Sequence, residues 1–327
     1  MRKMGQIKAF EVLEPGILTT VQDLGRFGFS QIGVPPSGAL DSLSLRIGNL
    51  LVGNEEGAAG LETTIMGLKL KAVREVVIAV TGGNLLPALN GKSLEMWKSH
   101  LLGEGDVLTF KGVRKGCRAY LAIGGGIGVP KIMGSRSTFL SGKFGGLEGR
   151  VLQKGDHLYA DGLPVPVGRI AASFPSDWIP VWDKEVILRV IPGPQDCHFT
   201  RQGFLTFQSS FYRVTTRIDR MGIRLEGPKI ERRPDVEESI ISESLIPGAI
   251  QVPGDGKPMV ILNELVTGGY TKIATITSTD LPKAAQLKPG DRVRFEPISV
   301  KYAHELLRKQ EGRVKSFKES LHLPRLA

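Results

Sequence analysis

Cysteine and aromatic residues are scarce in this sequence of 327 residues, and it has no long hydrophobic run. The two cysteines, Cys117 and Cys197, lie far apart and form no C-x-x-C motif. A disulfide scaffold and a zinc site or redox pair of that type are therefore excluded. The longest uncharged run, residues 76–91, contains Gly82 and Pro87 and is shorter than the ~20 residues that a membrane-spanning helix needs. We expect no interaction with a membrane.

The first residues of the sequence do not predict a secretory signal peptide. They begin with basic residues, but Glu11 and Glu14 occur before any apolar stretch of the necessary length. Together with the scarcity of cysteine, this predicts a soluble, cytoplasmic protein.

The sequence has a basic balance, with 43 Lys and Arg against 33 Asp and Glu and a formal net charge of +10. Part of the surplus lies in residues 301–325, and the rest is scattered as single residues among acids. Nucleic-acid-binding proteins usually carry a dense basic stripe, with aromatic residues that stack on bases, and neither occurs here. We therefore expect anionic substrates or an acidic partner surface, and no nucleic acid.

Glycine is abundant, with 41 residues, about 12.5% of the chain against a usual ~7%, and 20 prolines accompany it. Short apolar runs alternate with glycine turns at residues 61–65, 76–81, 107–110 and 118–123. This rhythm favours a mostly β fold, a barrel or a sandwich, with a few helices.

Two helices are predicted within this β-rich pattern. Asp41 is a candidate N-cap for a helix that ends near Gly53. Apolar residues at helical spacing follow Ser299 and predict a C-terminal helix. That helix either packs on the C-terminal domain or binds a partner.

We predict an N-terminal β-rich domain over residues 1–165, a proline-rich linker over 166–184, and a C-terminal β-barrel domain over 185–327 that includes the C-terminal helix. Three segments of the first half recur in order in the second half at nearly constant spacing, which indicates two related β-domains. The matching segments are 62–67 with 243–248, 81–83 with 267–269, and 102–110 with 287–295.

Several familiar motifs of catalysis and nucleotide binding are missing. Gly91-Lys92-Ser93 lacks the first glycine of a Walker motif, because Leu86 stands in its place. The five histidines show no spacing typical of metal ligands, and residues 134–137 are not a nucleophile elbow. The sequence predicts neither a metal centre nor a hydrolase triad.

Four clusters place arginine, aspartate, tyrosine and small hydroxyl residues beside glycines, a combination that can bind an anion. Simpler interpretations are open for each cluster: Asp41 caps a helix, Asp23 pairs with Arg26, residues 219–227 form a surface strand with internal salt bridges, and Tyr270 fills the mouth of the barrel. The candidates are Arg26, Ser37 and Asp41 in residues 19–41; Arg136 and Ser137 in 134–150; Asp219, Arg220 and Arg224 in 219–227; and Tyr270 in 267–270.

The order of these motifs resembles one protein family. The sequence contains TTVQDLGRFGF, GVPPSGALD, LVGN, LETT, GSRST, GGLEGR, DRMGIRLEGP, PGAIQVPGDGKP and TGGY, in this order, from about residue 7 to residue 297. The series is similar to the allophanate hydrolase subunit 2 family, also called biotin-dependent carboxyltransferase-like or KipA-like. The resemblance implies cyclophilin-like β-barrels.

The resemblance also implies three possible functions. Stand-alone members resemble the C subunit of an ATP-dependent 5-oxoprolinase. They act with a KipI-like B subunit and a LamB/YcsF-like A subunit to convert 5-oxo-L-proline to L-glutamate, with ATP bound by or shared within the complex. Fused members form half of the carboxyltransferase domain of a biotin-dependent urea carboxylase. A third branch is a non-catalytic antagonist of the kinase inhibitor KipI. We expect the first function, an enzyme subunit that needs its partners.

Under this hypothesis the candidate residues divide into two roles. Asp41, Asp219 and Tyr270 are the predicted catalytic residues, which orient the lactam or a water molecule. The predicted substrate ligands, which hold carboxylate or phosphoryl oxygens, are Arg26, Ser37, Arg136, Ser137, Arg220 and Arg224. One segment departs from the family: residues 263–266 read Asn-Glu-Leu-Val where members usually have Asp-Arg-Gln-Thr. The substrate therefore stays open.

Overall fold

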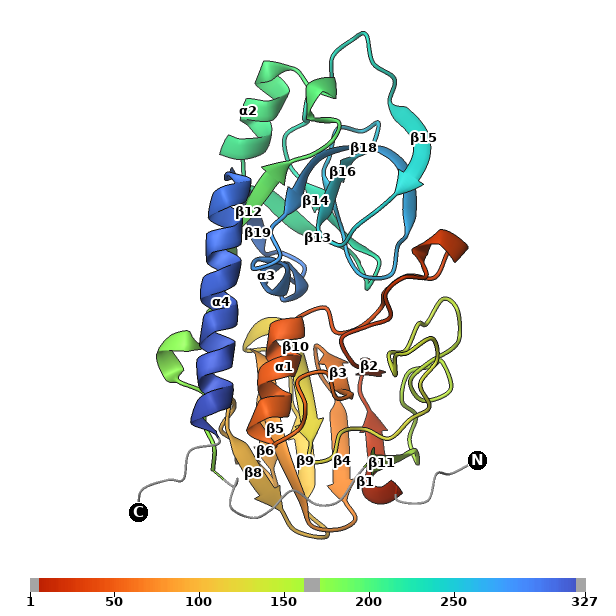
Figure 1. Ribbon diagram of the computed structural model, residues 1–327, viewed down its shortest axis with the longest axis vertical. Coiled ribbons are helices and arrows are strands. Elements are labelled where there is room, and N and C mark those ends of the chain that lie inside the picture. The colour runs from red at the N-terminus through yellow and green to blue at the C-terminus, as the bar shows by residue number, and fades with distance from the viewer. Residues whose placement is uncertain (1–5, 162–170, 322–327) are drawn as a thin grey trace. The chain divides into compact units, whose positions relative to one another are not determined.

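The computed structural model describes residues 6–161 and 171–321, which divide into two compact units (Figure 1). Unit 1 takes its residues from the ranges 1–26, 37–181 and 312–327, and unit 2 takes its residues from 27–36 and 182–311. The units are thus assembled from interleaved segments, whereas the predicted domains are contiguous. Of the predicted linker, residues 166–170 lie outside the described residues. None of the helices described is long and apolar enough to span a membrane.

Unit 1 contains two antiparallel sheets, one of six and one of five strands. The six-stranded sheet has the order β11-β1-β4-β9-β6-β7, and its strands are β1 (Gln6–Pro15), β4 (Leu68–Ala72), β6 (Pro87–Leu89), β7 (Lys92–Ser93), β9 (Val107–Phe110) and β11 (His157–Asp161). The five-stranded sheet has the order β2-β3-β10-β5-β8, and its strands are β2 (Leu18–Gln22), β3 (Gly60–Thr64), β5 (Val76–Asn84), β8 (Ser99–Leu102) and β10 (Lys115–Ile123).

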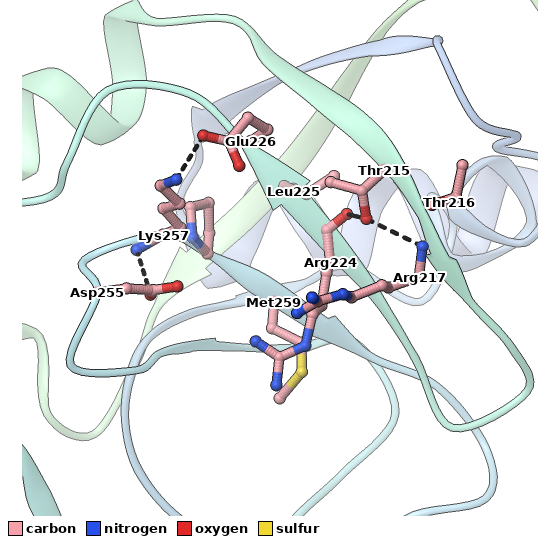
Figure 2. A pocket seen from close by; sticks show the side chains of 10 residues that line it. Thr215, Thr216, Arg217, Arg224, Leu225, Glu226, Asp255, Lys257 and Met259 are labelled. Carbon is pink, nitrogen blue, oxygen red and sulfur yellow. Dashed lines mark hydrogen bonds and ion pairs between the residues drawn. The ribbon is translucent and has the colours of Figure 1, made fainter.

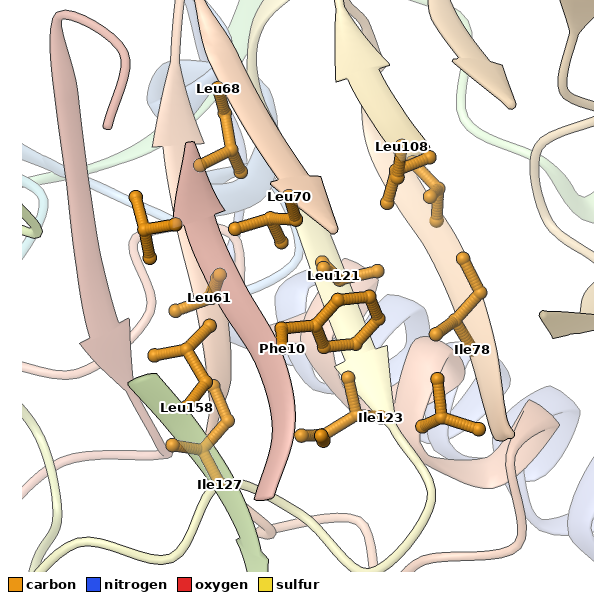
Figure 3. Close-up of a cluster of buried hydrophobic side chains, with 14 of the residues drawn as sticks. Phe10, Leu61, Leu68, Leu70, Ile78, Leu108, Leu121, Ile123, Ile127 and Leu158 are labelled. Carbon is orange, nitrogen blue, oxygen red and sulfur yellow. The ribbon is translucent and has the colours of Figure 1, made fainter. Parts of the chain in front are cut away.

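The core of unit 1 is formed by apolar side chains from both of its sheets (Figure 3). Phe10 of β1 and Leu70 of β4 come from the first sheet, and Ile78 of β5 and Leu121 of β10 come from the second. All four are fully buried, and each such side chain contributes roughly 1.5–3 kcal/mol of hydrophobic stabilisation. The apolar side chains that both sheets contribute to this one cluster therefore join the sheets into a sandwich.

Helix α1 (Ser42–Leu51) packs against β5 and β10 and confirms the helix predicted from Asp41. The Asp41 carboxylate accepts a hydrogen bond from the backbone N–H of Ser44 at 2.9 Å and so caps the helix. Thr81 Oγ1 donates to the carbonyl of Ser44 at 2.7 Å. A Cβ atom on Gly48 would lie 3.0 Å from that same Oγ1, so the glycine permits this close packing.

Unit 2 is built on one sheet of eight strands in the order β12-β19-β13-β14-β17-β16-β18-β15. An additional pairing of β12 with β18 closes the sheet into a barrel and leaves β15 at the edge. The strands are β12 (Glu185–Pro192), β13 (Tyr212–Ile218), β14 (Gly222–Glu226), β15 (Ser239–Ser244), β16 (Ala249–Val252), β17 (Met259–Ile261), β18 (Thr267–Ile276) and β19 (Arg292–Pro297). The helices α2 (Arg201–Ser209) and α3 (Leu281–Ala285) accompany them.

The predicted C-terminal helix is present as α4 (Val300–Ser320). Its residues up to 311 belong to unit 2, but the following residues belong to unit 1. There Phe317 packs edge-on against Phe174, with ring centroids 4.9 Å apart, and Arg313 lies over the ring of Trp178 at 5.6 Å. The helix therefore does not pack on the C-terminal domain alone, because these aromatic contacts attach its last turns to unit 1.

One of the predicted repeats has the same backbone structure in both units. Asp106 accepts a hydrogen bond from the N–H of Gly103, and Asp291 accepts one from the N–H of Lys288, at 2.8 and 3.0 Å. Each aspartate follows a glycine with φ near +90°, the conformation that a type II turn requires. A third copy, at residues 152–158, makes the same turn and was missed in the sequence. Turns of this kind connect the short strands, and the fold is mostly β with a few helices, as predicted from the glycine-punctuated apolar runs.

Candidate functional site

A partly polar site of unit 2 lies on strands β13, β14 and β17 (Figure 2). Two hollows of about 380 and about 420 Å³ overlap there. We call them together the Arg217–Arg224 pocket, because both hollows are lined by Thr216, Arg217, Arg224 and Met259.

Strand register explains why Arg224 faces this pocket. In β14, Ile223 and Leu225 are buried in the barrel, so the alternation of the strand turns Arg224 to the other face. Arg224 lies directly opposite Met259 of β17, which brings a guanidinium and an apolar side chain together on one surface.

A β-bulge in β13 explains the position of Arg217. Val214 pairs with Leu225 and Ile218 pairs with Ile223, so the intervening stretch of β13 is longer than that of β14. Such extra residues bend a strand and redirect its side chains. Thr215 holds the bent segment: its Oγ1 donates to the carbonyl of Arg224 at 2.9 Å and accepts from the N–H of Arg217 at 3.1 Å.

The charges of the pocket are unevenly paired. The ammonium of Lys257 forms an ion pair with Glu226. By contrast, the guanidinium groups of Arg217 and Arg224 make no hydrogen bond or ion pair with any residue in the ranges 6–161 and 171–321. Figure 2 shows both side chains extending toward Met259. Two cationic groups thus face one hollow, where a guanidinium can bind a planar oxyanion through two parallel hydrogen bonds.

Another part of the pocket lining is an apolar wall. It is formed by Met221, Met259, Ile261 and Leu265. Ile261 belongs to a buried cluster, against which Met259 and Leu265 pack, so this wall is a continuation of the core. A cationic side and an apolar side together suit a small organic anion.

Asp219 and Arg220, two predicted site residues, form the turn between β13 and β14. Asp219 Oδ1 accepts hydrogen bonds from the N–H of Met221 at 2.7 Å and from that of Gly222 at 3.0 Å, which fixes the turn beside the pocket. Arg220 is buried instead, and its Nε donates to Glu264 Oε1 at 2.5 Å. Glu264 belongs to the segment that departs from the family, and here it supplies a partner for Arg220.

Tyr270, the third predicted catalytic residue, lies in β18 and is 39% exposed. Its carbonyl accepts a hydrogen bond from Gln251 Nε2 at 3.4 Å. It is not among the residues that line the Arg217–Arg224 pocket.

In unit 1, the structure brings several predicted ligands together around the buried carboxylate of Asp23, an arrangement that we call the Asp23 junction. Its Oδ1 accepts hydrogen bonds from Ser135 Oγ at 2.6 Å, Ser137 Oγ at 2.5 Å and the N–H of Gly25 at 2.8 Å. Its Oδ2 accepts from the N–H of Arg136 at 2.6 Å. The junction ties two loops that are distant in the sequence.

The arginines of the Asp23 junction contact groups of the protein itself. The guanidinium of Arg26 donates to the carbonyl of Ser137 and lies 5.0 Å from the ring centroid of Phe144. Arg136 pairs with Asp161, and its Nε donates to the carbonyl of Val129 at 2.9 Å. These contacts stabilise the loops, and the roles of these residues as substrate ligands stay predictions.

Asp41 belongs to a second buried network in unit 1. Its N–H donates to the hydroxyl of Tyr120 at 2.8 Å, and that hydroxyl donates to Glu62 Oε2 at 2.7 Å. Burial, and then the negative charges of Glu62 and Asp41, raise the pKa of Tyr120 well above its ordinary value. Ser37 is fully buried nearby in sequence and has φ +53°. Both predicted residues therefore lie in the interior of unit 1.

Sequence reasoning missed Arg217, Thr216 and Met259. The bulge that redirects Arg217 is set by pairing with β14, and no local pattern in the sequence encodes that pairing. Within the described ranges, no group of three or more His, Cys, Asp and Glu residues is placed to hold a metal ion.

Comparisons with known proteins identify the relatives of this chain. The family model of the carboxyltransferase domain, subdomains A and B, matches residues 32–297. The C subunit of 5-oxoprolinase from Escherichia coli is 36% identical, over 95% of this chain and 98% of that protein. Urea amidolyase of Lachancea kluyveri is 38% identical over 95% of this chain, which spans only 18% of that protein. The structure of the K. lactis urea amidolyase matches with a TM-score of 0.90 and 36% identity, over 98% of this chain and 20% of that one.

Proposed function

The chain belongs to the family of the carboxyltransferase domain, subdomains A and B, and from this premise we propose that it is the C subunit of an ATP-dependent 5-oxoprolinase. One observation carries the proposal: the chain and the C subunit of the E. coli enzyme match along nearly their whole lengths, 95% and 98%. The match to urea amidolyase covers only 18% of a much longer protein. The matched region is thus nearly the whole of the subunit, whereas it is a small part of urea amidolyase.

In this function the chain acts on 5-oxo-L-proline together with KipI-like and LamB/YcsF-like partners, and ATP drives the opening of the lactam to L-glutamate. Substrate and product both carry a carboxylate. Arg224 is the predicted ligand whose surroundings support this role, because it lines an open pocket and has no partner among the described side chains. Asp219, at the edge of the same pocket, orients the lactam or water.

The test is ATP-dependent release of glutamate from 5-oxo-L-proline. We would assay the chain alone first, and then the chain together with the KipI-like and LamB/YcsF-like proteins of the same genome. We expect activity only in the complete mixture. Arg224→Ala should lower kcat/KM. The control is Arg213→Ala, which removes an exposed arginine outside the pocket and should leave kcat/KM unchanged. A complete mixture that assembles but releases no glutamate would refute the proposal.

A second candidate is the carboxyltransferase half of a biotin-dependent enzyme. The structural match to the K. lactis urea amidolyase, with a TM-score of 0.90, supports it. This function requires a biotin carboxylase and a biotinylated carrier protein. Carboxylation of urea by a mixture of the three proteins, without release of glutamate from 5-oxo-L-proline, would favour this candidate over the first.

A further inference from the structure

We propose that the Arg217–Arg224 pocket is a binding site for a small organic monocarboxylate, whose carboxylate bridges the two guanidinium groups and whose carbon skeleton lies on the wall of Met259 and Leu265. The proposal deepens the proposed function by assigning a substrate class to this pocket, and it rests on that function for the reaction, although not for the binding itself. It adds Arg217 as a second ligand.

The first argument is the pairing of charges. The buried Arg220, in the turn beside the pocket, has Glu264 as its partner. Arg224 is half-buried and Arg217 is exposed. Both line the same hollow, and neither has a hydrogen-bond or ion-pair partner among the residues that the structure describes. Two like charges at one site repel each other, and an anion between them removes this repulsion while it satisfies both guanidinium groups.

The second argument is that the backbone holds both arginines in place. Arg224 is fixed by the pairing of β14 with β17, opposite Met259. Arg217 is fixed by the bulge in β13, where Thr215 Oγ1 connects its N–H to the carbonyl of Arg224. A single threonine side chain therefore links the backbones of the two ligands. Such preorganisation lowers the entropic cost of binding.

The third argument concerns the charge of the ligand. The pocket is lined by three cationic side chains, Arg217, Arg224 and Lys257, and by three acidic ones, Asp219, Glu226 and Asp255. The formal charges of these side chains therefore cancel, and positive charge is concentrated between the two arginines. A monoanion matches this distribution, whereas the several charges of a polyphosphate would meet the surrounding carboxylates.

The fourth argument concerns the body of the ligand. The apolar wall of Met221, Met259 and Leu265 would lie against bare phosphate oxygens if the ligand were inorganic. A carboxylate attached to a short carbon skeleton places its charge on the arginines and its apolar part on the wall. The hollow of about 420 Å³ accommodates a molecule of that size.

The experiment measures binding to the full chain alone by titration calorimetry with three probes. These are 5-oxo-L-proline, the uncharged lactam 2-pyrrolidone, which lacks only the carboxylate, and inorganic phosphate. We expect saturable binding of 5-oxo-L-proline and none of 2-pyrrolidone. Arg217→Ala and Arg224→Ala should each weaken the affinity by about tenfold or more, the usual effect of losing a charge-assisted pair. Arg213→Ala should leave it unchanged.

Three outcomes would overturn the inference: no saturable binding of 5-oxo-L-proline, equal binding of 2-pyrrolidone, or tighter binding of phosphate. Circular dichroism verifies that each variant is folded.

Assays of the complete mixture of the chain and its partners separate this inference from the proposed function. If Arg217→Ala and Arg224→Ala retain the KM and kcat of the wild type there, the pocket is not the substrate site although the function stands. Carboxylate binding by a chain that supports no glutamate release refutes the function and leaves the pocket assigned.

Discussion

The Asp23 junction of unit 1 and the Arg217–Arg224 pocket of unit 2 arise from the same kind of sequence, in which arginines and small hydroxyl residues lie near glycines. In the junction, Arg26 and Arg136 bind carbonyl and carboxylate oxygens of the protein. In the pocket, Arg217 and Arg224 have no such partner within the described residues and line an open hollow. The sequence pattern identifies arginines that can bind an oxyanion. The acceptors that the fold places near each arginine decide whether it binds oxygen atoms of the protein itself.

The physical reason is the cost of burial. A charged group that is removed from water must be compensated by hydrogen bonds and opposite charge. Arg26 is only 2% exposed, and it therefore needs the Ser137 carbonyl and the ring of Phe144. An arginine at the edge of an open pocket remains accessible to water and can exchange that water for a ligand. Substitutions can therefore distinguish the two regions by their effects on stability.

The largest effect should follow the loss of the central carboxylate of the junction. Asp23→Ala removes the acceptor of four hydrogen bonds, from Gly25, Ser135, Arg136 and Ser137. We expect the free energy of unfolding to fall by about 3 kcal/mol or more, because buried donors lose a charged partner. Urea denaturation followed by circular dichroism measures this change.

The control for Asp23→Ala is Glu104→Ala, which removes an exposed carboxylate from a turn of the same unit. Its effect should stay within about 0.5 kcal/mol. If the two variants were equally stable, the junction would not be a structural element, and the comparison of the two regions would fail.

A smaller effect should follow the removal of one hydroxyl beneath α1. Tyr120→Phe leaves the N–H of Asp41 and the carboxylate of Glu62 without the hydroxyl that now connects them. We expect a loss of about 2 kcal/mol, typical of unsatisfied buried groups. Thermal and urea denaturation measure it, with Tyr302→Phe on the exposed surface of α4 as the control. An unchanged transition would show that Asp41 needs only its helix-capping bonds.

Arg189 of unit 2 is another paired arginine, and it extends the comparison because the stability contributed by its partner Asp280 depends on pH. Burial tends to raise the pKa of Asp280, but hydrogen bonds from Arg189 and the charge of Lys283 outweigh it and hold that pKa below its ordinary value. The resulting stability is present above the unfolded pKa of about 3.9 and is lost as the pH falls through the lower folded pKa.

Asp280→Asn should therefore flatten the acid side of the stability profile by on the order of 1 kcal/mol. Urea denaturation between neutral pH and pH 2 measures the slope for both proteins. Asp177→Asn, at an exposed position, is the matched control and should keep the slope of the wild type. A wild-type slope in Asp280→Asn would show that its ion pair does not govern acid stability.

The smallest effect should follow substitution of the pocket arginines. Arg217→Ala and Arg224→Ala remove side chains that have no partner in the described structure, so the free energy of unfolding should change by less than about 0.5 kcal/mol. Binding of 5-oxo-L-proline should nevertheless decrease. A large loss of stability in either variant would show that its arginine stabilises the fold, as the arginines of the Asp23 junction do. The contrast between the two regions would then be wrong.

Features that depend on neighbours in the sequence were predictable. The helix that begins after Asp41 and the helix that begins at Val300 occur where the capping residue and the apolar spacing predict them. The β-rich architecture follows from glycine turns between short apolar runs. The repeated turn at Gly105 and Gly290 requires a positive φ, which glycine adopts at little cost.

Features that depend on distant contacts were not predictable. The last turns of α4 belong to unit 1 because Phe317 meets Phe174, and nothing near Phe317 in the sequence indicates that partner. Arg220 was predicted as a substrate ligand from its residue type, and the fold supplies Glu264 as its buried partner, while its role as a ligand stays a prediction. The candidate site followed the same rule: Arg224 and Asp219 were identified by residue type, and Arg217 was missed.

The sequence by itself determined that this chain is mostly β, where its main helices begin, and to which family it belongs, since these properties reside in local patterns and in the order of motifs. Only the tertiary structure decided which arginines bind groups of the protein itself and which line an open pocket with no partner among the described residues. The reason is that the pairing of a charge depends on the acceptors that the fold brings to it. Asp23 collects three of its four donors from residues more than a hundred positions away. The bulge opposite β14 directs Arg217 into the pocket.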